Sequence, residues 1–210
     1  MKIAYKHLVK NIIANPSIDE ISDRLFQLGH EHEIENDIFN MELTPNRGDC
    51  LSLNGLLRDL SVFYDVNVNQ EIYDEKLNIL DIDFENFSQD TCPQISFLKL
   101  EIESIPDKYK DYLNDYFIDL NLNKNNFFTD ISNYISYENG QPTHCYDADK
   151  ISGKLVFQEL DTDQEFETLL EKKINLTNKN PVFLLNDKVI NLAGVIGGIE
   201  TSCSSDTKTA

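Results

Sequence analysis

The sequence predicts an α+β protein, with a small helical module first and a domain of mixed helices, short strands and hairpins after it. Apolar residues recur at helical spacing near the beginning of the chain, and they alternate as in a strand at residues 98–103. The later helix and strand signals mix irregularly, which favours an α+β domain over a doubly wound sheet. We expect three segments, at residues 1–40, 41–94 and 95–210.

The first segment is interpreted as helical. Residues 2–13 place their apolar side chains roughly on one helical face after a short extended start. Ser17 and Glu20 then form a capping-box pattern, in which each side chain accepts from the other residue's backbone N–H. Gly29 supplies the left-handed stop of this second helix. The acidic stretch 30–41 has no clear period, and we expect a linker there.

The second segment contains one clear helix signal, at about 51–65, where leucines form a wide apolar stripe. Asp49 precedes this stripe and is the expected N-cap. Residues 66–94 are polar with scattered apolar positions. We expect them to run over the surface.

The third segment combines several short elements. The alternating residues 98–103 predict a half-buried strand, and a helix is expected to begin at Pro106. Asn186 and Asp187 are typical of a hairpin turn. Further short strands are expected at 126–131, 154–159 and 181–185.

The charge of the chain bears on its partners. The formal net charge is −19, and arginine occurs only at Arg24, Arg47 and Arg58. Since Lys and Arg supply most of the affinity for phosphate backbones, the isolated chain is expected to bind RNA poorly. Contact with RNA would need a local patch or a partner that supplies positive charge. No apolar run is long enough to cross a membrane, so we expect a cytoplasmic protein without a membrane partner.

The four cysteines are scattered along the chain and form no Cys-x-x-Cys pair. The histidines are not spaced as ligands beside them, so we expect no metal site. Reduced, mostly buried thiols are the expected state.

Three stretches are more specific. Residues 43–52 are Leu-Thr-Pro-Asn-Arg-Gly-Asp-Cys-Leu-Ser, and residues 140–151 are Gly-Gln-Pro-Thr-His-Cys-Tyr-Asp-Ala-Asp-Lys-Ile, preceded by Asp-Ile-Ser-Asn-Tyr at 130–134. Residues 192–201 are Leu-Ala-Gly-Val-Ile-Gly-Gly-Ile-Glu-Thr. In this order and spacing, they closely resemble the N-terminal region of the bacterial-type phenylalanyl-tRNA synthetase beta chain. The resemblance covers nearly all of the sequence.

That resemblance implies a role in translation. In the family, the beta chain pairs with a catalytic alpha chain as an (αβ)₂ tetramer, binds tRNA(Phe) and carries an editing site that hydrolyses mischarged Tyr-tRNA(Phe). Residues 95–210 are then the expected editing domain, with no cofactor of their own and no DNA partner. ATP and magnesium belong to aminoacylation in the parent complex.

The resemblance also implies an editing pocket. His144 matches a histidine that lines the pocket near the terminal adenosine of the tRNA. Pro142 precedes it in a tight loop, and Thr143 is a weaker candidate for the pocket. A packed loop histidine bonded to backbone is the alternative for His144. No residue is assigned as catalytic.

Small residues are expected to form the wall of this pocket. Ala193 and Gly194 match the wall beside the bound tyrosine, and Gly197 leaves backbone open to a ligand. A strand with bulges and tight turns is the alternative. Ser132 offers a hydroxyl where the family usually has threonine, and a strand hydroxyl bonded to backbone is its alternative role.

Two basic residues are weaker candidates for tRNA contact. Arg47 is expected either to meet phosphate or to bridge loops through its planar donor fork. Lys124 stands beside Asn123, at which position the family usually has arginine. A polar contact at the rim of the pocket is therefore in question.

The resemblance further implies that a glutamate facing the tyrosyl hydroxyl follows shortly after Ala210. We therefore expect a chain truncated at its C-terminus, with an incomplete pocket. Three functions stay open: the editing region of a synthetase, a non-catalytic scaffold with a decayed site, and a free-standing factor that edits tRNA in trans.

Overall fold

Two separate groups of buried apolar side chains divide the chain into two compact units. The first unit comprises Met1–Asp74, Asp107–Asn125 and Asp130–Thr143, and the second comprises Glu75–Pro106, Asn126–Thr129 and His144–Ala210. The computed structural model describes residues 1–67, 76–177 and 179–210. The units do not coincide with segments bounded at residues 40 and 95. The mixture of helices and short strands is the α+β class predicted from the sequence.

A three-stranded antiparallel sheet forms the first part of the first unit. Its order is β1 (Lys2–Ala4), β3 (Ile38–Glu42) and β2 (Glu31–Glu35). The expected linker at 30–41 is therefore wrong, since β2 and β3 form a hairpin. Its turn residues, Asn36 and Asp37, both have positive φ, which suits the twist of a tight hairpin.

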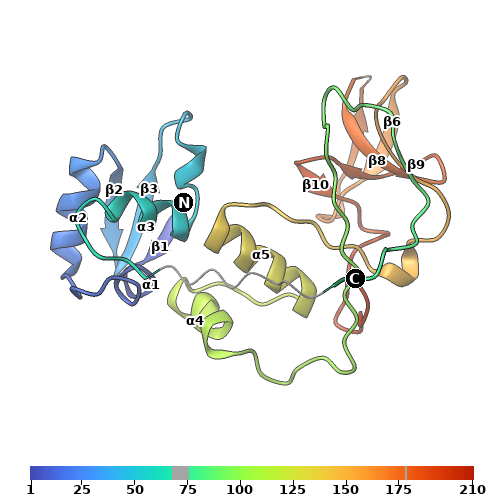
Figure 1. Ribbon diagram of the computed structural model, residues 1–210. Helices are drawn as coiled ribbons and strands as arrows, with labels where there is room; N and C mark the ends of the chain where they lie inside the picture. Colours follow the sequence, from blue (N-terminus) through green and yellow to red (C-terminus); the bar gives the residue numbers. More distant parts are fainter. Residues whose placement is uncertain (68–75, 178) are drawn as a thin grey trace. The chain divides into compact units, whose positions relative to one another are not determined.

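Three helices accompany this sheet: α1 (Tyr5–Val9), α2 (Ile18–Gln27) and α3 (Leu53–Leu60). Figure 1 shows α2 and α3 over one face of the sheet. The short extended start expected within 2–13 is confirmed as β1, but the helix that follows it, α1, ends at Val9 and does not continue to residue 13. The helix within 51–65 is confirmed as α3, and the capping box of α2 is also confirmed.

The N-cap of α3 corrects a second expectation. Ser52 accepts a hydrogen bond from the Gly55 N–H, so Ser52 and not Asp49 is the N-cap. Asp49 lies instead in the short 3₁₀ helix η1 (Gly48–Cys50). Glycine is required at 55, since a Cβ there would lie 2.1 Å from the Asp49 carbonyl oxygen.

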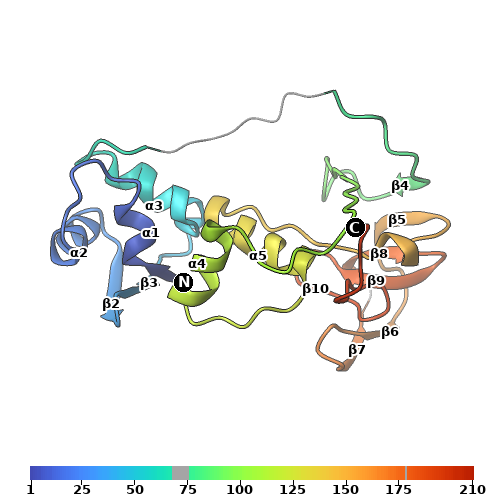
Figure 2. The same ribbon diagram turned by 90° about the horizontal axis from the view of Figure 1, so that it is seen from below.

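Helices α4 (Asp111–Asp119) and α5 (Phe127–Asn139) lie side by side (Figure 2). The helix expected from Pro106 begins five residues later, and the strand expected at 126–131 is wrong. Asn126 explains the second error, because its side chain accepts from the Thr129 N–H and caps α5. No helix in the described ranges has the length and apolar character needed to cross a membrane.

A five-stranded sheet dominates the second unit. Its order is β10 (Ile196–Gly197), β9 (Lys188–Leu192), β8 (Pro181–Leu185), β5 (Leu155–Glu159) and β4 (Phe84–Asn86). The strands expected at 154–159 and 181–185 are confirmed as β5 and β8. The turn at Asn186 and Asp187 is also confirmed, with φ angles of 50° and 67°. Strand β4 lies within residues 66–94, which were expected to run over the surface. A separate hairpin joins β6 (Gln164–Glu167) and β7 (Lys173–Leu176).

The strand expected at 98–103 is not a regular strand. Leu100 instead exchanges backbone hydrogen bonds with Ala210, at 2.8 and 3.0 Å, and Glu101 forms an isolated bridge with Thr209. The alternating pattern therefore marks extended backbone, but its partner is at the far end of the sequence.

Candidate functional site

His144 directly follows the loop of residues 140–143, and its imidazole ring packs against Tyr146 and Gly197. The His144 and Tyr146 ring centroids are 4.5 Å apart at an interplanar angle of 70°, an edge-to-face contact. A Cβ on Gly197 would lie 2.2 Å from His144 Cε1, so the ring rests on bare backbone. Although the residue is exposed overall, burial of the ring lowers the pKa of His144 below 6.5. The imidazole is therefore mainly neutral at pH 7.

Tyr146 and Asn191 support the histidine from the protein side. Asn191 is a buried polar residue of β9, and its side chain acts to lower the pKa of the Tyr146 phenol. Burial of Tyr146 raises this pKa by more, so the phenol is neutral at pH 7. A neutral phenol is thus fixed beside His144. Sequence patterns do not identify this pair, since the two residues are 45 positions apart.

Ala193 and Gly194 form the turn between β9 and β10. The Ala193 N–H donates to the Pro181 carbonyl at 3.0 Å. Gly194 has φ of +71° and is exposed, and no atom would lie within 4 Å of a Cβ at this position. The turn geometry explains the glycine. It also leaves the backbone of Gly194 open to an approaching molecule.

Ser132 and Thr143 form a hydroxyl pair in the first unit. The two hydroxyl oxygens are 2.6 Å apart, and Ser132 also donates to the Thr143 carbonyl oxygen at 3.0 Å. Ser132 lies on helix α5, so the expected strand position is wrong, although the expected bond to backbone is present. The buried hydroxyl of Ser132 therefore ties the loop before His144 to α5.

The structure assigns the expected pocket residues to two different units. Ser132, Pro142 and Thr143 belong to the first unit, and His144, Ala193, Gly194 and Gly197 belong to the second. Two pairs among them are in contact: Ser132 with Thr143, and His144 with Gly197. The second pair forms the candidate site.

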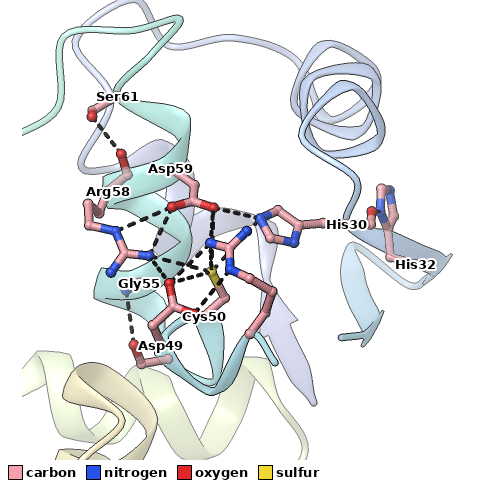
Figure 3. Close-up of polar contacts among 10 residues, drawn as sticks. His30, His32, Asp49, Cys50, Gly55, Arg58, Asp59 and Ser61 are labelled. Atoms are coloured by element: carbon pink, nitrogen blue, oxygen red, sulfur yellow. Dashed lines mark hydrogen bonds and ion pairs between the residues drawn. The ribbon is translucent and has the colours of Figure 1, made fainter. Parts of the chain in front are cut away.

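Arg47 is the centre of a polar network in the first unit (Figure 3). Its guanidinium donates to both carboxylate oxygens of Asp49 at 3.1 Å and to Asp59 Oδ2 at 2.5 Å. Arg58 bonds the same two carboxylates. Burial alone would raise the pKa of Asp59, but the arginine hydrogen bonds hold it well below its usual range. The network binds the 44–52 loop to α3, and this is the bridging role considered for Arg47.

Three donors in this network have the proximity of metal ligands. Ligand atoms of His30, Cys50 and Asp59 lie within 4.8 Å of one another. However, an Arg47 nitrogen lies 2.7 Å from Cys50 Sγ, so a cation already stands among them. Burial, followed by the charge of Asp59, raises the pKa of the Cys50 thiol to about 12. With the Arg47 guanidinium among these groups, the cluster is an internal ion network in this structure.

Lys124 is also engaged within the first unit. Its ammonium group donates to Asn114 Oδ1 at 2.9 Å and lies 4.5 Å from the Tyr109 ring centroid, a cation–π distance. It is therefore placed by neighbouring side chains instead of extending freely into solvent.

Comparison with known proteins identifies the region that contains the candidate site. The model of the B3/4 domain family matches residues 105–210, which include His144, Tyr146 and Gly197. The chain is 31% identical to the phenylalanine–tRNA ligase beta subunit of Ehrlichia ruminantium (strain Welgevonden), over 96% of this chain and 26% of that protein. It is 30% identical to the same subunit of Psychrobacter arcticus, over 83% of this chain and 22% of that protein.

One solved structure also aligns with this chain. An N-terminal fragment of the Pyrococcus horikoshii phenylalanyl-tRNA synthetase beta subunit aligns over all of this chain and 65% of that fragment, at 15% identity and a TM-score of 0.49. The chain spans about a quarter of the length of its curated relatives. Since the family model matches more than half of the sequence, the chain belongs to the B3/4 domain family, in the form similar to the N-terminal region of phenylalanine–tRNA ligase beta subunits.

Proposed function

We propose that this chain is part of a phenylalanine–tRNA ligase beta subunit and that its second unit edits mischarged Tyr-tRNA(Phe) by hydrolysis. The observation that carries the proposal is the contact of His144 with Gly197 inside the B3/4 match. A neutral imidazole there has an exposed side for a ligand, and the open turn at Gly194 belongs to the same unit.

The small difference between phenylalanine and tyrosine explains why a phenylalanine–tRNA ligase needs a second site for editing. Phenylalanine and tyrosine differ by one hydroxyl, and an apolar pocket rejects an added hydroxyl by only about 10²-fold. A second pocket that hydrogen-bonds this hydroxyl would instead select tyrosine. Phenylalanine would leave the polar groups of that pocket unpaired and would be excluded.

The proposed role of His144 is to orient and not to attack. An aminoacyl ester is already reactive, so hydrolysis mainly requires a held tRNA end and an oriented water. The neutral imidazole of His144 offers one donor and one acceptor for this purpose. Gly194 would let the ester approach the backbone closely, and the Ser132 and Thr143 hydroxyls are weaker proposed contacts.

The proposed partners are an alpha subunit, in an (αβ)₂ assembly in the cytoplasm, and tRNA(Phe). Aminoacylation with ATP and magnesium is assigned to the alpha subunit. With a net charge of −19, this chain is not expected to hold tRNA alone. Arg47 and Lys124 stay proposed phosphate contacts, but each would have to give up internal partners.

A non-catalytic scaffold is the second candidate. Asn123, where the resemblance puts an arginine, favours it, because an uncharged side chain removes a possible contact to substrate. The two candidates differ in activity. The scaffold predicts assembly with the alpha subunit but no hydrolysis.

The test uses the full-length beta subunit purified with its alpha subunit. Hydrolysis of Tyr-tRNA(Phe) is measured for the wild type and for His144→Ala, and phenylalanylation is the control reaction. We expect the variant to hydrolyse at least about 10-fold more slowly with unchanged phenylalanylation, since oriented groups of this kind contribute a factor of that order or more. Hydrolysis at the wild-type rate would remove His144 from the site, and a wild type without hydrolysis would favour the scaffold.

A further inference from the structure

Cys145 and Cys203 lie opposite each other in the second unit. Tyr146 and Ser202 form an antiparallel bridge, and the Asp147 N–H donates to the Thr201 carbonyl at 2.9 Å. In antiparallel pairing, the residue before a paired residue lies opposite the residue that follows its partner on the other segment. The residue before Tyr146 therefore faces the residue after Ser202, and these two residues are cysteines. The two cysteines are not joined by a disulfide in this structure.

The expected spacing of this pair suits a disulfide. The Asp147 N–H bonds the Thr201 carbonyl on one side of the Tyr146–Ser202 bridge, and regular antiparallel pairing across that bridge makes Cys145 and Cys203 a pair of the hydrogen-bonded kind. Such pairs have Cα atoms about 5.5 Å apart, and disulfides usually span about 4.4–6.8 Å. In a hydrogen-bonded pair the opposite Cβ atoms lie toward the upper end of about 4.5–5.5 Å, whereas a disulfide needs about 3.5–4.5 Å. The two segments must therefore approach each other by about 1 Å to form the bond.

The surroundings give the two sulfurs different roles. Cys203 is buried, whereas Cys145 is partly exposed, with its Sγ 3.4 Å from the Phe128 carbonyl oxygen. A disulfide would replace this contact of Cys145 Sγ by a bond to Cys203 Sγ. The more accessible Cys145 is thus placed to react first with a molecule from solution. Burial raises the pKa of Cys203 to about 12, so its thiol is protonated at neutral pH.

We propose that Cys145 and Cys203 are a modification site that forms a reversible disulfide with a small-molecule disulfide such as glutathione disulfide. The Cys145 thiolate attacks one sulfur of glutathione disulfide, which releases one glutathione thiolate and leaves a mixed disulfide. The Cys203 thiolate then attacks Cys145 Sγ and releases the second glutathione thiolate. Two protein thiols are oxidised and one glutathione disulfide is reduced to two glutathione molecules.

The proposed Cys145–Cys203 disulfide would lie next to the candidate site. Cys145 directly follows His144, and the bridged Tyr146 is the residue whose ring contacts the imidazole. Oxidation would therefore covalently tie the segment that carries His144 to residues 201–203. The sulfur chemistry does not depend on editing, so it stands or falls apart from the proposed function.

The other two cysteines provide internal controls. The Cys50 thiol accepts from Arg47 at 2.7 Å in the first unit. Cys92 lies in the second unit with its Sγ 3.6 Å from the Gln94 carbonyl oxygen. Neither residue is paired across an antiparallel bridge with a cysteine among the bridges of the described residues. Both should therefore stay reduced under conditions that oxidise the proposed pair.

The experiment treats the reduced 210-residue chain with glutathione disulfide at pH 8, then alkylates it in denaturant and maps its peptides by mass spectrometry. We expect the alkylated thiols to fall from the four in the sequence to two, with one linked peptide pair containing Cys145 and Cys203. Dithiothreitol should restore all of them. The reaction should be faster at pH 9, because the thiolate fraction of Cys203 rises about tenfold per pH unit below its pKa.

Matched variants complete the test. Cys50→Ser should still form the linked peptide, whereas Cys145→Ser should keep its remaining thiols reduced. The proposal is overturned if all four thiols of the wild type stay free. It is also overturned if glutathione stays on Cys145 without a link to Cys203, or if Cys145 pairs with Cys92. The main result comes from the wild-type chain, so a variant that folds poorly cannot decide the outcome.

Discussion

The imidazole of His144 rests on the backbone of Gly197 so closely that one added carbon would lie 2.2 Å from Cε1. No ordinary Cβ contact is that short, so the ring and a side chain at position 197 exclude each other. Position 197 requires glycine because the His144 ring occupies the space that a Cβ would need. The φ of Gly197 is not in the left-handed region, so its backbone conformation does not itself require glycine. The ring atoms nearest to Gly197 are Cε1 and its two neighbouring nitrogens.

Replacing Gly197 with alanine should displace His144 without removing it. We expect Tyr-tRNA(Phe) hydrolysis to fall by about 10-fold or more, because small misplacements of an orienting group can cost as much as 10²-fold. The measurement is the single-turnover hydrolysis rate of the full-length subunit with its alpha partner.

Gly48→Ala is the matched control for this substitution. No atom would lie within 4 Å of a Cβ at Gly48, and its φ is not in the left-handed region. Its hydrolysis rate should equal that of the wild type. Equal rates for Gly197→Ala and the wild type would show that the position of the His144 ring does not affect the hydrolysis of Tyr-tRNA(Phe).

Stability should fall as the pH is lowered through about 6.5. Burial is the main cause that lowers the pKa of both His7 and His144 below the ordinary value of 6.5. The unfolded chain therefore binds more protons than the folded chain in this range, and stability rises with pH. Asp49 and Asp59 have lowered pKa values and lose their contribution only as the pH falls below about 3.8.

Urea unfolding at pH 7.5 and pH 5.5 measures this dependence. We expect a lower midpoint at pH 5.5, and a smaller difference between the two pH values in His7→Gln. A midpoint that is independent of pH between 5.5 and 7.5 would contradict the lowered pKa values of His7 and His144.

Tyr137 holds His7 inside the first unit. Its hydroxyl lies 2.7 Å from His7 Nδ1, whereas His7 Nε2 lies 3.2 Å from Asp119 without hydrogen-bond alignment. Tyr137→Phe leaves a buried ring nitrogen unpaired and should lower the free energy of unfolding by about 1–3 kcal/mol. Tyr112→Phe, at an exposed position, should stay within about 0.5 kcal/mol of the wild type. Similar small effects for both variants would argue against the His7 bond.

Asp59 is the shared acceptor of the Arg47 network. Its Oδ2 also lies 2.9 Å from Nε2 of the buried His30. Asp59→Ala should destabilise the first unit by about 1–3 kcal/mol, because His30 loses its partner away from water. The check is the urea midpoint, with the exposed Asp23→Ala as control. A loss no greater than that of the control would mean that the network does not stabilise the loop.

Local signals in the sequence predicted the elements that depend on near neighbours. The capping box at Ser17 and the turn at Asn186 and Asp187 lie where expected, because each motif satisfies backbone groups only a few residues away. The hairpin at 30–41 was missed because charged residues occupy most outward positions. Only Phe39 and Met41 of β3, together with His32 of β2, turn inward to buried positions.

Distant pairing explains the other errors. Residues 98–103 lack a regular strand because their partner is the 208–210 segment, which no local pattern reveals. The β-like residues at 126–131 form a helix because the Asn126 side chain caps its first turn. Within the candidate site, the resemblance pointed to His144 and Gly197. Their contact, and the support from Tyr146 and Asn191, depend on how β9 and β10 meet.

The most direct measurement compares the hydrolysis of Tyr-tRNA(Phe) and Phe-tRNA(Phe) by the full-length subunit with its alpha partner. A pocket that bonds the tyrosyl hydroxyl should hydrolyse the tyrosyl ester at least about 10²-fold faster than the phenylalanyl ester. Equal rates for the two esters, or hydrolysis of neither, would contradict the proposal that this chain carries a tyrosine-specific editing site.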